Sequence, residues 1–196
     1  GLDAERGQGR EERLGARQAG HGHRRARVDE GRFDGLAAVV GDAVYIAGSL
    51  QGFDFSAIAD GWRLDTSASE PTWTSLTPMP NNRRRGSAGV AVIGARVYLV
   101  GGFRGGAVAE VDVFDTTTGD EAAAWATLPN LPGARDHGAA VAHDGKVYYL
   151  GGRDSDISAV HDDVWVFDPA APEAGWVALA PLPTARGGIA AAVYDG

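Results

Sequence analysis

The chain has 196 residues, of which 44% are hydrophobic and 22% charged, so its length and composition suit a globular unit with a sizeable core. A formal net charge of −8 at pH 7 argues against nucleic acid as a partner, and no stretch is apolar and long enough to span a membrane. The absence of cysteine excludes disulfides, thiolate metal ligands and thiol nucleophiles within this sequence.

The first 31 residues differ in composition from the rest of the chain. They are rich in Arg, Glu and Gly and contain almost no large apolar side chains, so they cannot bury enough surface to offset the entropy of ordering. We expect residues 1–31 to be a disordered tail or a stretch that is not native to the protein. His21 and His23 could ligate a metal, but an isolated pair is weak evidence, and we predict no metal site.

From residue 32 onward the sequence repeats itself about every fifty residues. A phrase that begins with arginine starts at Arg32, Arg85, Arg135 and Arg186, at steps of 53, 50 and 51 residues. A second phrase, which begins with tryptophan and ends in proline, keeps the same period at Trp73, Trp125 and Trp176. Self-similarity at this period is typical of stacked modules, and a period near fifty indicates propeller blades.

Each repeat divides into four short strand signals separated by turn residues. In the second repeat these signals cover residues 87–93, 96–100, 110–114 and 124–128, and the same plan runs through the first and third repeats. We therefore predict an all-β fold, an incomplete β-propeller of four-stranded antiparallel blades. The blades are expected at about 32–84, 85–134 and 135–185, with the first strand of another blade at 186–196.

The residues that recur once per repeat are interpreted as structural. Large aromatic side chains at a fixed place in each blade suit packing between blades, and paired glycines suit close backbone approach rather than phosphate binding. We expect the repeated arginines to hydrogen-bond loop carbonyls, and the alternative is a ring of positive charge at the mouth of the propeller. The recurrent positions other than the arginines are Tyr45, Tyr98, Tyr148, Trp73, Trp125, Trp176, Gly101, Gly102, Gly151 and Gly152.

Residues 32–196 resemble kelch repeats. The likeness lies in the double glycine, the Val-Tyr pair before it, the tryptophan 24 to 28 residues later, and the P-x-x-R entry. It implies a propeller that commonly has six blades, with ligands met by two sets of loops on one face. The candidate contact residues on those loops are Asp34, Ser49, Ser87, Phe103, Arg104, His137, Arg153 and Asp154, with Gly188 at the fourth copy of the first set. The longest loops are expected at Ser49–Asp60 and Arg153–Asp162.

The favoured function is a binding or scaffold module that presents these loops to a protein or peptide. The alternative is a carbohydrate-active propeller, similar to sialic-acid mutarotases or to galactose oxidase. The galactose-oxidase type needs a Cys–Tyr cofactor and copper, which this sequence cannot complete without cysteine. For a mutarotase, His137 and Arg153 could serve, but the sequence assigns them no acidic partner. We predict no catalytic residue and no cofactor, and analogy with microbial kelch proteins slightly favours secretion.

An open half-ring of blades exposes unpaired strand edges and two blade faces. We therefore expect residues 32–196 alone to be marginally stable or to self-associate. Size-exclusion chromatography with light scattering and a thermal melt test this, and a monomer with a cooperative melt would contradict it.

Overall fold

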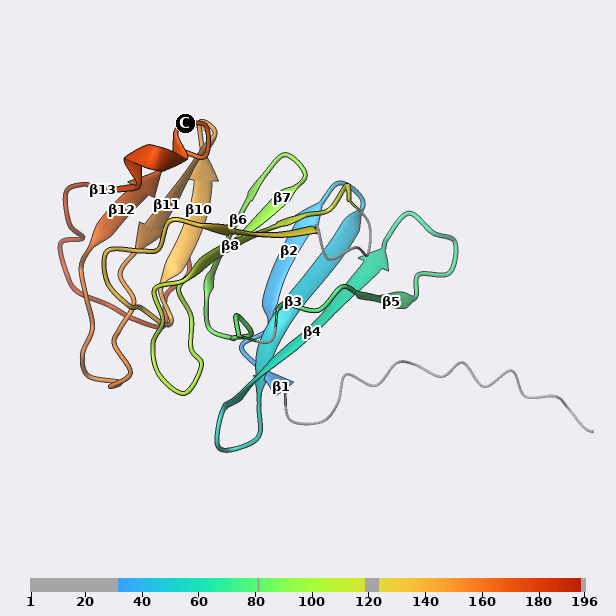
Figure 1. The fold of residues 1–196 in the computed structure, drawn as a ribbon, viewed down its shortest axis with the longest axis horizontal. Helices are drawn as coiled ribbons and strands as arrows, with labels where there is room; N and C mark the ends of the chain where they lie inside the picture. The colour runs from blue at the N-terminus through green and yellow to red at the C-terminus, as the bar shows by residue number, and fades with distance from the viewer. Residues whose placement is uncertain (1–31, 81, 119–123, 195–196) are drawn as a thin grey trace, which may run out of the picture.

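The computed structural model describes residues 32–80, 82–118 and 124–194, and it forms three antiparallel sheets that follow one another in chain order (Figure 1). The first sheet contains β1 (Arg32–Phe33), β2 (Leu36–Val40), β3 (Ala43–Gln51), β4 (Ser56–Asp65) and β5 (Trp73–Leu76). The second contains β6 (Gly89–Ile93), β7 (Arg96–Val100), β8 (Val111–Asp115) and β9 (Trp125–Leu128). The third contains β10 (Ala139–His143), β11 (Lys146–Leu150), β12 (Val164–Phe167) and β13 (Trp176–Ala178), with a 3-10 helix η2 (Pro172–Ala174) before the last strand.

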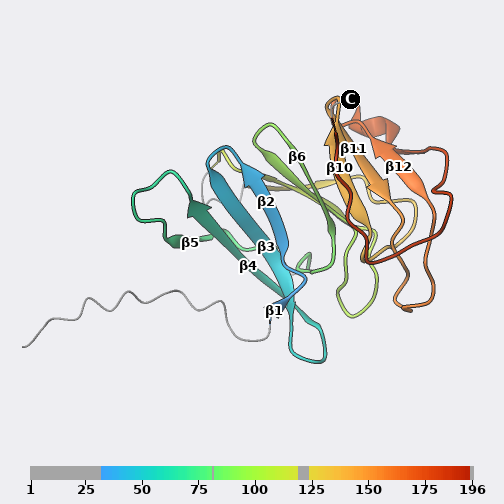
Figure 2. The same cartoon turned by 180° about the vertical axis from the view of Figure 1, so that it is seen from behind.

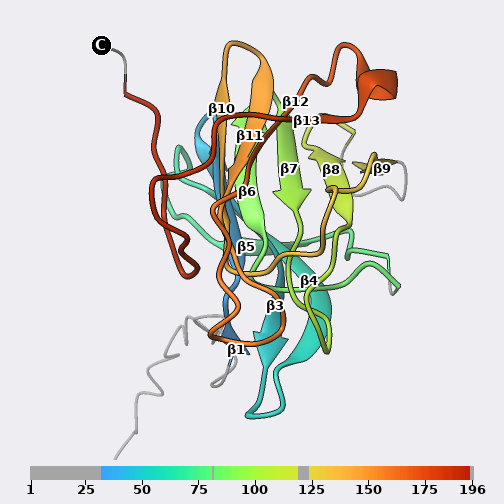
Figure 3. The ribbon, with the colours of Figure 1, turned by 90° about the vertical axis from the view of Figure 1, so that its left-hand side faces the viewer.

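The prediction of an all-β, partial propeller with four-stranded blades is confirmed by this arrangement. The inner strands β2, β6 and β10 lie in succession, and β6 contacts both of the others (Figure 2). Seen from the side, the three sheets overlap one in front of another, as stacked blades should (Figure 3). Within the described ranges, no helix is long and apolar enough to cross a membrane.

The first blade differs from the prediction in its long connection. We expected a loop over Ser49–Asp60, but β3 and β4 continue as a hairpin, with Ser49 paired to Ile58 and only residues 52–55 left for the turn. The hairpin continues because a bulge between Ala47 and Ser49, where Gly48 has a φ of +66°, shifts the register without ending the pairing. The loop prediction for this segment is therefore wrong. The added strand β1 pairs with the extended end of β3.

Residues 186–194 do not form the inner strand expected for another blade. A strand is defined by hydrogen bonds to a neighbour, and no described residue pairs with this segment as a strand. The segment is nevertheless tied to the third blade by its backbone, because the N–H of Gly152 donates to the carbonyl of Arg186 at 2.9 Å.

Two apolar clusters hold the blades together, one in each space between neighbouring sheets. Tyr45 faces the second blade, where its ring lies 6.3 Å from that of Phe114. Tyr98 faces the third blade and shares a cluster with Tyr149 and other buried side chains. The two aromatic side chains on β7 and β11 that point into these spaces are almost completely buried, with Tyr98 2% exposed and Tyr149 fully enclosed.

Tyr148 lies at the position equivalent to Tyr98 but is only half-buried. Side chains alternate along β11, so Tyr149 faces the second blade while Tyr148 faces away from it. Tyr148 therefore lies on a blade face that no described sheet covers.

The tryptophans link the outer strands of successive blades by hydrogen bonds as well as by packing. The indole Nε1 of Trp125 donates to the carbonyl of Thr77 at 3.1 Å, and that of Trp176 donates to the carbonyl of Pro129 at 2.9 Å. Each acceptor lies four residues after the tryptophan of the preceding blade. The repeated Trp phrase therefore serves as the donor in one blade and the acceptor in the blade before it.

In each blade a glycine lies directly against the carbonyl of the next repeated arginine, at the bulge within β3 or just after β7 or β11. A Cβ built on Gly48, Gly101 or Gly151 would come within 2.5 or 2.6 Å of the carbonyl oxygens of Arg85, Arg135 or Arg186, respectively. All three glycines also have positive φ angles. Both the backbone conformation and the close approach therefore require glycine at this position.

The side chain of Arg85 is completely buried inside its own blade. Its guanidinium donates to the carbonyls of Arg83, Leu99 and Gly101, and Nη1 lies 2.6 Å from Oδ2 of Asp112. Burial lowers the pKa of Arg85, and the Asp112 carboxylate opposes that shift. The guanidinium therefore holds β7 and β8 against the turn that precedes the inner strand β6.

The same arginine–aspartate pair occurs in all three blades at a spacing of 28, 27 and 28 residues. Arg32 donates to Asp60 at 3.0 Å, and Arg135 donates to Asp163 at 2.6 Å while lying 5.3 Å from the ring centroid of Trp165. The pairs differ mainly in exposure, since the Asp60 side chain is 49% exposed and that of Asp112 only 3%.

This difference in exposure predicts different stabilities for equivalent substitutions. Asp112→Ala leaves the buried Arg85 without its carboxylate, also removes the carboxylate that Arg83 contacts, and should lower the free energy of unfolding by about 3–5 kcal/mol. Asp60→Ala removes the exposed pair and should lower it by less than about 1 kcal/mol. Urea denaturation of both variants measures the two changes, and equal losses would contradict the structural role given to Arg85.

A second pair of variants separates the close approach of blades from backbone strain. Gly94 has a φ of +59° with nothing near its Cβ position, whereas Gly101 has a φ of +65° and faces the Arg135 carbonyl. Gly94→Ala should lower the free energy of unfolding by about 1–2 kcal/mol through strain alone, and Gly101→Ala by more than about 3 kcal/mol. Denaturant titration gives both values, and a Gly101→Ala loss no larger than that of Gly94→Ala would show that the blades do not require this contact.

Candidate functional site

The first set of predicted contact residues comes together where the inner strands begin. Asp34, Ser87, His137 and Gly188 each lie two residues after a repeated arginine, and all have φ between +50° and +67°. The N–H of Ser87 donates to the carbonyl of Asp34, that of His137 to Ser87 and that of Gly188 to His137, at 3.2, 3.0 and 2.7 Å. We call the turns at these four positions the entry turns. One backbone hydrogen bond joins each entry turn to the next, and the turns line an open hollow of about 280 Å³.

The side chains of these turns form a polar network across the hollow. The hydroxyl of Ser87 donates to Oδ2 of Asp34 at 2.8 Å, and Nε2 of His137 lies 3.4 Å from the same oxygen. On its other side, Nδ1 of His137 lies 2.6 Å from Oδ1 of Asp136. Both ring nitrogens of His137 therefore face carboxylates, one from the first blade and one from its own.

Asp136 anchors this network from below the surface. Its side chain is 1% exposed, and its Oδ1 also accepts a hydrogen bond from Nε of Arg153 at 2.8 Å. Two backbone hydrogen bonds of 2.9 Å between Asp136 and Arg153 fix their relative position. Sequence reasoning assigned no acidic partner to His137 and Arg153, whereas the structure gives them Asp136 in common. The adjacent Asp136 and His137 in the sequence could have indicated the partner of the histidine. The contact between Asp136 and Arg153 could not be found in this way, because it depends on the fold.

A buried tyrosine lies behind the network and was also missed. The ring of Tyr149 is stacked against that of Trp165 at 6.2 Å, and a Cβ on Gly138 would meet the Tyr149 hydroxyl at 2.3 Å. Burial raises the pKa of Tyr149, which keeps the phenol protonated. Gly138 is therefore needed to make room for the phenol directly behind the hollow.

The second set of predicted contact residues does not line the hollow. Ser49 is buried within β3, and Phe103 is half-buried in bridge pairs with Gly86 and Ala107. Arg104 forms an ion pair with Glu110, and Arg153 is directed to Asp136. Asp154 belongs to another cluster. The structure thus gathers Asp34, Ser87 and His137 in one site and places the remaining candidates outside its lining.

The cluster that contains Asp154 lies on the connection from β11 to β12. Oδ1 of Asp154 lies 3.0 Å from Nε2 of His161 and accepts from Nη1 of Arg135 at 3.3 Å. Nδ1 of His161 lies 3.6 Å from Oδ2 of Asp163, which is also the partner of Arg135. These carboxylates are occupied by an arginine, and no group of three or more potential metal ligands is found among residues 32–80, 82–118 and 124–194.

The repeated arginines do not present a ring of positive charge. The side chains of Arg85 and Arg135 are 0% and 10% exposed and bonded to Asp112 and Asp163. Arg32 is paired with Asp60, and Nε of Arg186 donates to the carbonyl of Thr184 at 3.2 Å. Carboxylates thus take up the guanidinium groups of Arg32, Arg85 and Arg135, and only the exposed Arg186 lacks a carboxylate partner among the described residues.

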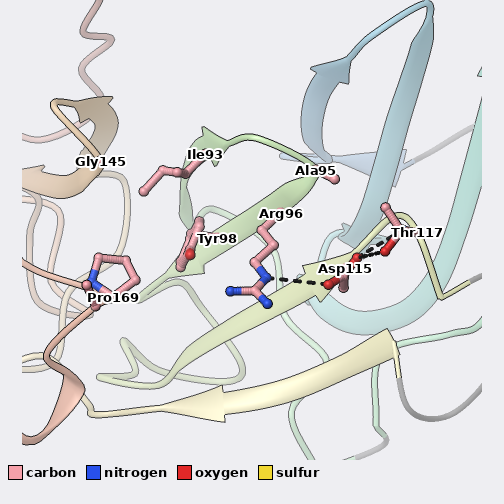
Figure 4. Close-up of a pocket in the computed structure, with 9 residues that line it drawn as sticks. Ile93, Ala95, Arg96, Tyr98, Asp115, Thr117, Gly145 and Pro169 are labelled. Carbon is pink, nitrogen blue, oxygen red and sulfur yellow. Dashed lines mark hydrogen bonds and ion pairs between the residues drawn. The ribbon is translucent and has the colours of Figure 1, made fainter.

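A second hollow, of about 400 Å³, opens at the opposite end of the sheets between the turns of the second and third blades (Figure 4). Arg96 and Asp115 lie on its wall with Nε and Oδ2 3.4 Å apart, and Asp115 accepts hydrogen bonds from the N–H and hydroxyl of Thr117. Those bonds lower the pKa of Asp115. Its charged groups are paired with one another, so this hollow offers no convergent free group for a ligand.

Comparison with protein families identifies the repeat. The model described as the KLHDC2/KLHL20/DRC7 Kelch-repeats domain matches residues 35–196. The chain belongs to this kelch-repeat family.

Two curated kelch proteins show the extent of the likeness. The Kelch-like protein terF of Aspergillus terreus is 32% identical over 167 residues, which cover 79% of this chain and 35% of that protein. The human Kelch repeat and BTB domain-containing protein 13 is 32% identical over 122 residues, which cover 61% of this chain and 25% of that protein. The kelch chain therefore matches about a third and a quarter, respectively, of the length of these relatives.

A solved structure supports the propeller fold. The structure of YjhT superposes with a TM-score of 0.61 at 20% sequence identity, covering 78% of this chain and 51% of that one. At this identity the likeness shows the fold alone, and the kelch chain corresponds to about half of that structure.

Proposed function

We propose that this kelch chain is a binding module that presents the entry turns of its blades, above all Asp34, Ser87 and His137, to a protein or peptide. The observation that carries the proposal is the hollow at these turns. It is the place where three blades contribute polar side chains to one concave surface. Concave sites with a few convergent polar groups are the usual place for recognition.

The backbone supports a recognition role for these positions rather than a purely structural one. Asp34, Ser87 and His137 hold positive φ angles that are uncommon for residues other than glycine, and the equivalent fourth position is Gly188. A glycine would satisfy the turn with less strain, so the side chains at the other three positions are not required by backbone geometry. They differ from blade to blade, as contact residues on a repeated scaffold do.

The carbohydrate-active alternative gains one feature from the structure, since His137 and Arg153 do have an acidic partner in Asp136. That carboxylate is 1% exposed, and its Oδ1 is already bonded to both neighbours. A buried, bonded group of this kind positions His137 and cannot reach a sugar in the hollow. The geometry therefore favours binding over catalysis.

Quantitative affinity purification tests the proposal with two matched double variants. The mouth variant is Asp34→Asn with His137→Asn, and the control is Asp144→Asn with His143→Asn at the opposite end of the third blade, where Nε2 of His143 lies 3.4 Å from Oδ2 of Asp144. Both remove one carboxylate and one imidazole, and asparagine tolerates the positive φ at Asp34, His137 and Asp144.

We expect proteins retained by the parent chain and the control to fall by about tenfold in the mouth variant, because the lost groups lie at the centre of the interface. Mass spectrometry of the bound fraction measures this. Equal retention by the two double variants would remove the entry turns from the binding surface.

A further inference from the structure

We propose that the hollow at the entry turns takes a basic side chain, so that the partner carries a Lys- or Arg-containing segment. This inference rests on the proposed function, because it specifies the chemistry recognised by the same site. It follows from which hydrogen-bonding groups of the hollow are already used and which remain available.

Three backbone N–H groups at the centre of the hollow are used within the protein. Consecutive N–H groups in a turn often create an anion site, but here those of Ser87, His137 and Gly188 all donate to the carbonyl of the preceding entry turn. An anionic ligand would therefore meet no free N–H at these three positions.

The side-chain donors are also used. The Ser87 hydroxyl is directed to Asp34, and the two ring nitrogens of His137 face Asp34 and Asp136. The guanidinium of Arg153 does not line the hollow: its Nε donates to Asp136, and its Nη2 lies 3.1 and 3.3 Å from the two ring nitrogens of His137. The polar side chains of the hollow thus have no donor directed at a ligand.

An acceptor remains in the carboxylate of Asp34. Its side chain is 39% exposed, and both contacts with Ser87 and His137 are made by Oδ2. None of the described residues donates to Oδ1, which leaves this oxygen for a ligand. A cationic donor is the group that such a carboxylate binds most strongly.

The apolar part of the lining suits a long basic side chain rather than a small cation. Leu36, Ala88 and Ile189 line the same hollow as Asp34. Lys and Arg side chains lay their methylene groups along apolar surface while their charged end reaches a polar partner. The site therefore combines an aliphatic wall for the stem with a carboxylate for the charge.

The chain contains a matched control for the charge of Asp34. Asp144 also has a positive φ, +48° against +50°, and its side chain is 83% exposed in the turn between β10 and β11. Asp34→Asn and Asp144→Asn therefore change the net charge equally and keep a residue that tolerates the turn. Any difference between them reports the position of the carboxylate rather than the overall charge.

Fluorescence anisotropy with labelled hexa-arginine and hexa-glutamate peptides tests the inference at about 0.15 M salt, where distant charges are screened. The parent chain should bind hexa-arginine and not hexa-glutamate. Asp34→Asn should weaken binding by about fivefold or more, and Asp144→Asn by less than about twofold. Thermal melts of both variants confirm that each remains folded.

Three results would overturn the inference. They are equal weakening by the two variants, binding of hexa-glutamate as tight as that of hexa-arginine, and no binding of hexa-arginine by the parent chain. If any of these occurs while the mouth double variant still loses its partner proteins, the binding function stands and the recognition of a basic side chain is wrong. If the affinity purification fails as well, the proposed function fails with it.

Discussion

The contact between a glycine of one blade and the arginine carbonyl of the next is the constraint on which the described structure depends. At Gly101 and Gly151 the approach leaves no space for a Cβ, and the following glycine donates its N–H to the same carbonyl. This contact brings the backbone of one blade to the entry turn of its neighbour. The contact fixes the position of the entry turn and therefore of the arginine at its start. Arg85 and Arg135 are thereby directed into their own blades, where they bind Asp112 and Asp163.

The arginine–aspartate pair is thus best understood as a consequence of that backbone contact. A buried guanidinium is costly unless every donor has a partner, and Arg85 meets this condition through four carbonyls in addition to Asp112. The carbonyls belong to the end of the second strand, to the residue before the third strand and to the entry turn itself. The pair therefore makes the position of the entry turn depend on the strands of its own blade, while the glycine contact makes it depend on the blade before.

The repeat made the blades predictable because period, turn glycines and strand patterns all agree with one another. The strands of the second blade lie within two residues of the expected ranges. The partners inside a blade were harder to find. In the sequence Asp112 looks like the outward polar residue of a half-buried strand, and only its pairing with Arg83 and Arg85, 29 and 27 residues away, allows it to be buried. The hairpin over Ser49–Asp60 was missed because its Gly, Ser and Asp content is typical of a loop, whereas strand pairing across the bulge decides its structure.

The candidate site was partly predictable for the same reason. The positions Asp34, Ser87, His137 and Gly188 could be aligned by their distance from the repeated arginine. Their mutual contacts could not, because those contacts depend on how closely one blade follows the next. Asp136 shows the limit most clearly, since its neighbour His137 was identified from the repeat while its bond to Arg153 joins two loops of one blade.

The backbone of the entry turns also limits which side chains can line the hollow. A residue there must tolerate a positive φ, which favours Gly, Asn, Asp and His and disfavours β-branched or bulky apolar side chains. Because the N–H groups of Ser87, His137 and Gly188 are donated to the preceding turn, variation of the side chain there leaves the link between blades intact. Such a position can change from carboxylate to hydroxyl to imidazole without altering the fold. The backbone bonds between turns thus hold the blades together without using the side chains at these positions. A single repeated scaffold can therefore present a different polar group from each blade to the hollow.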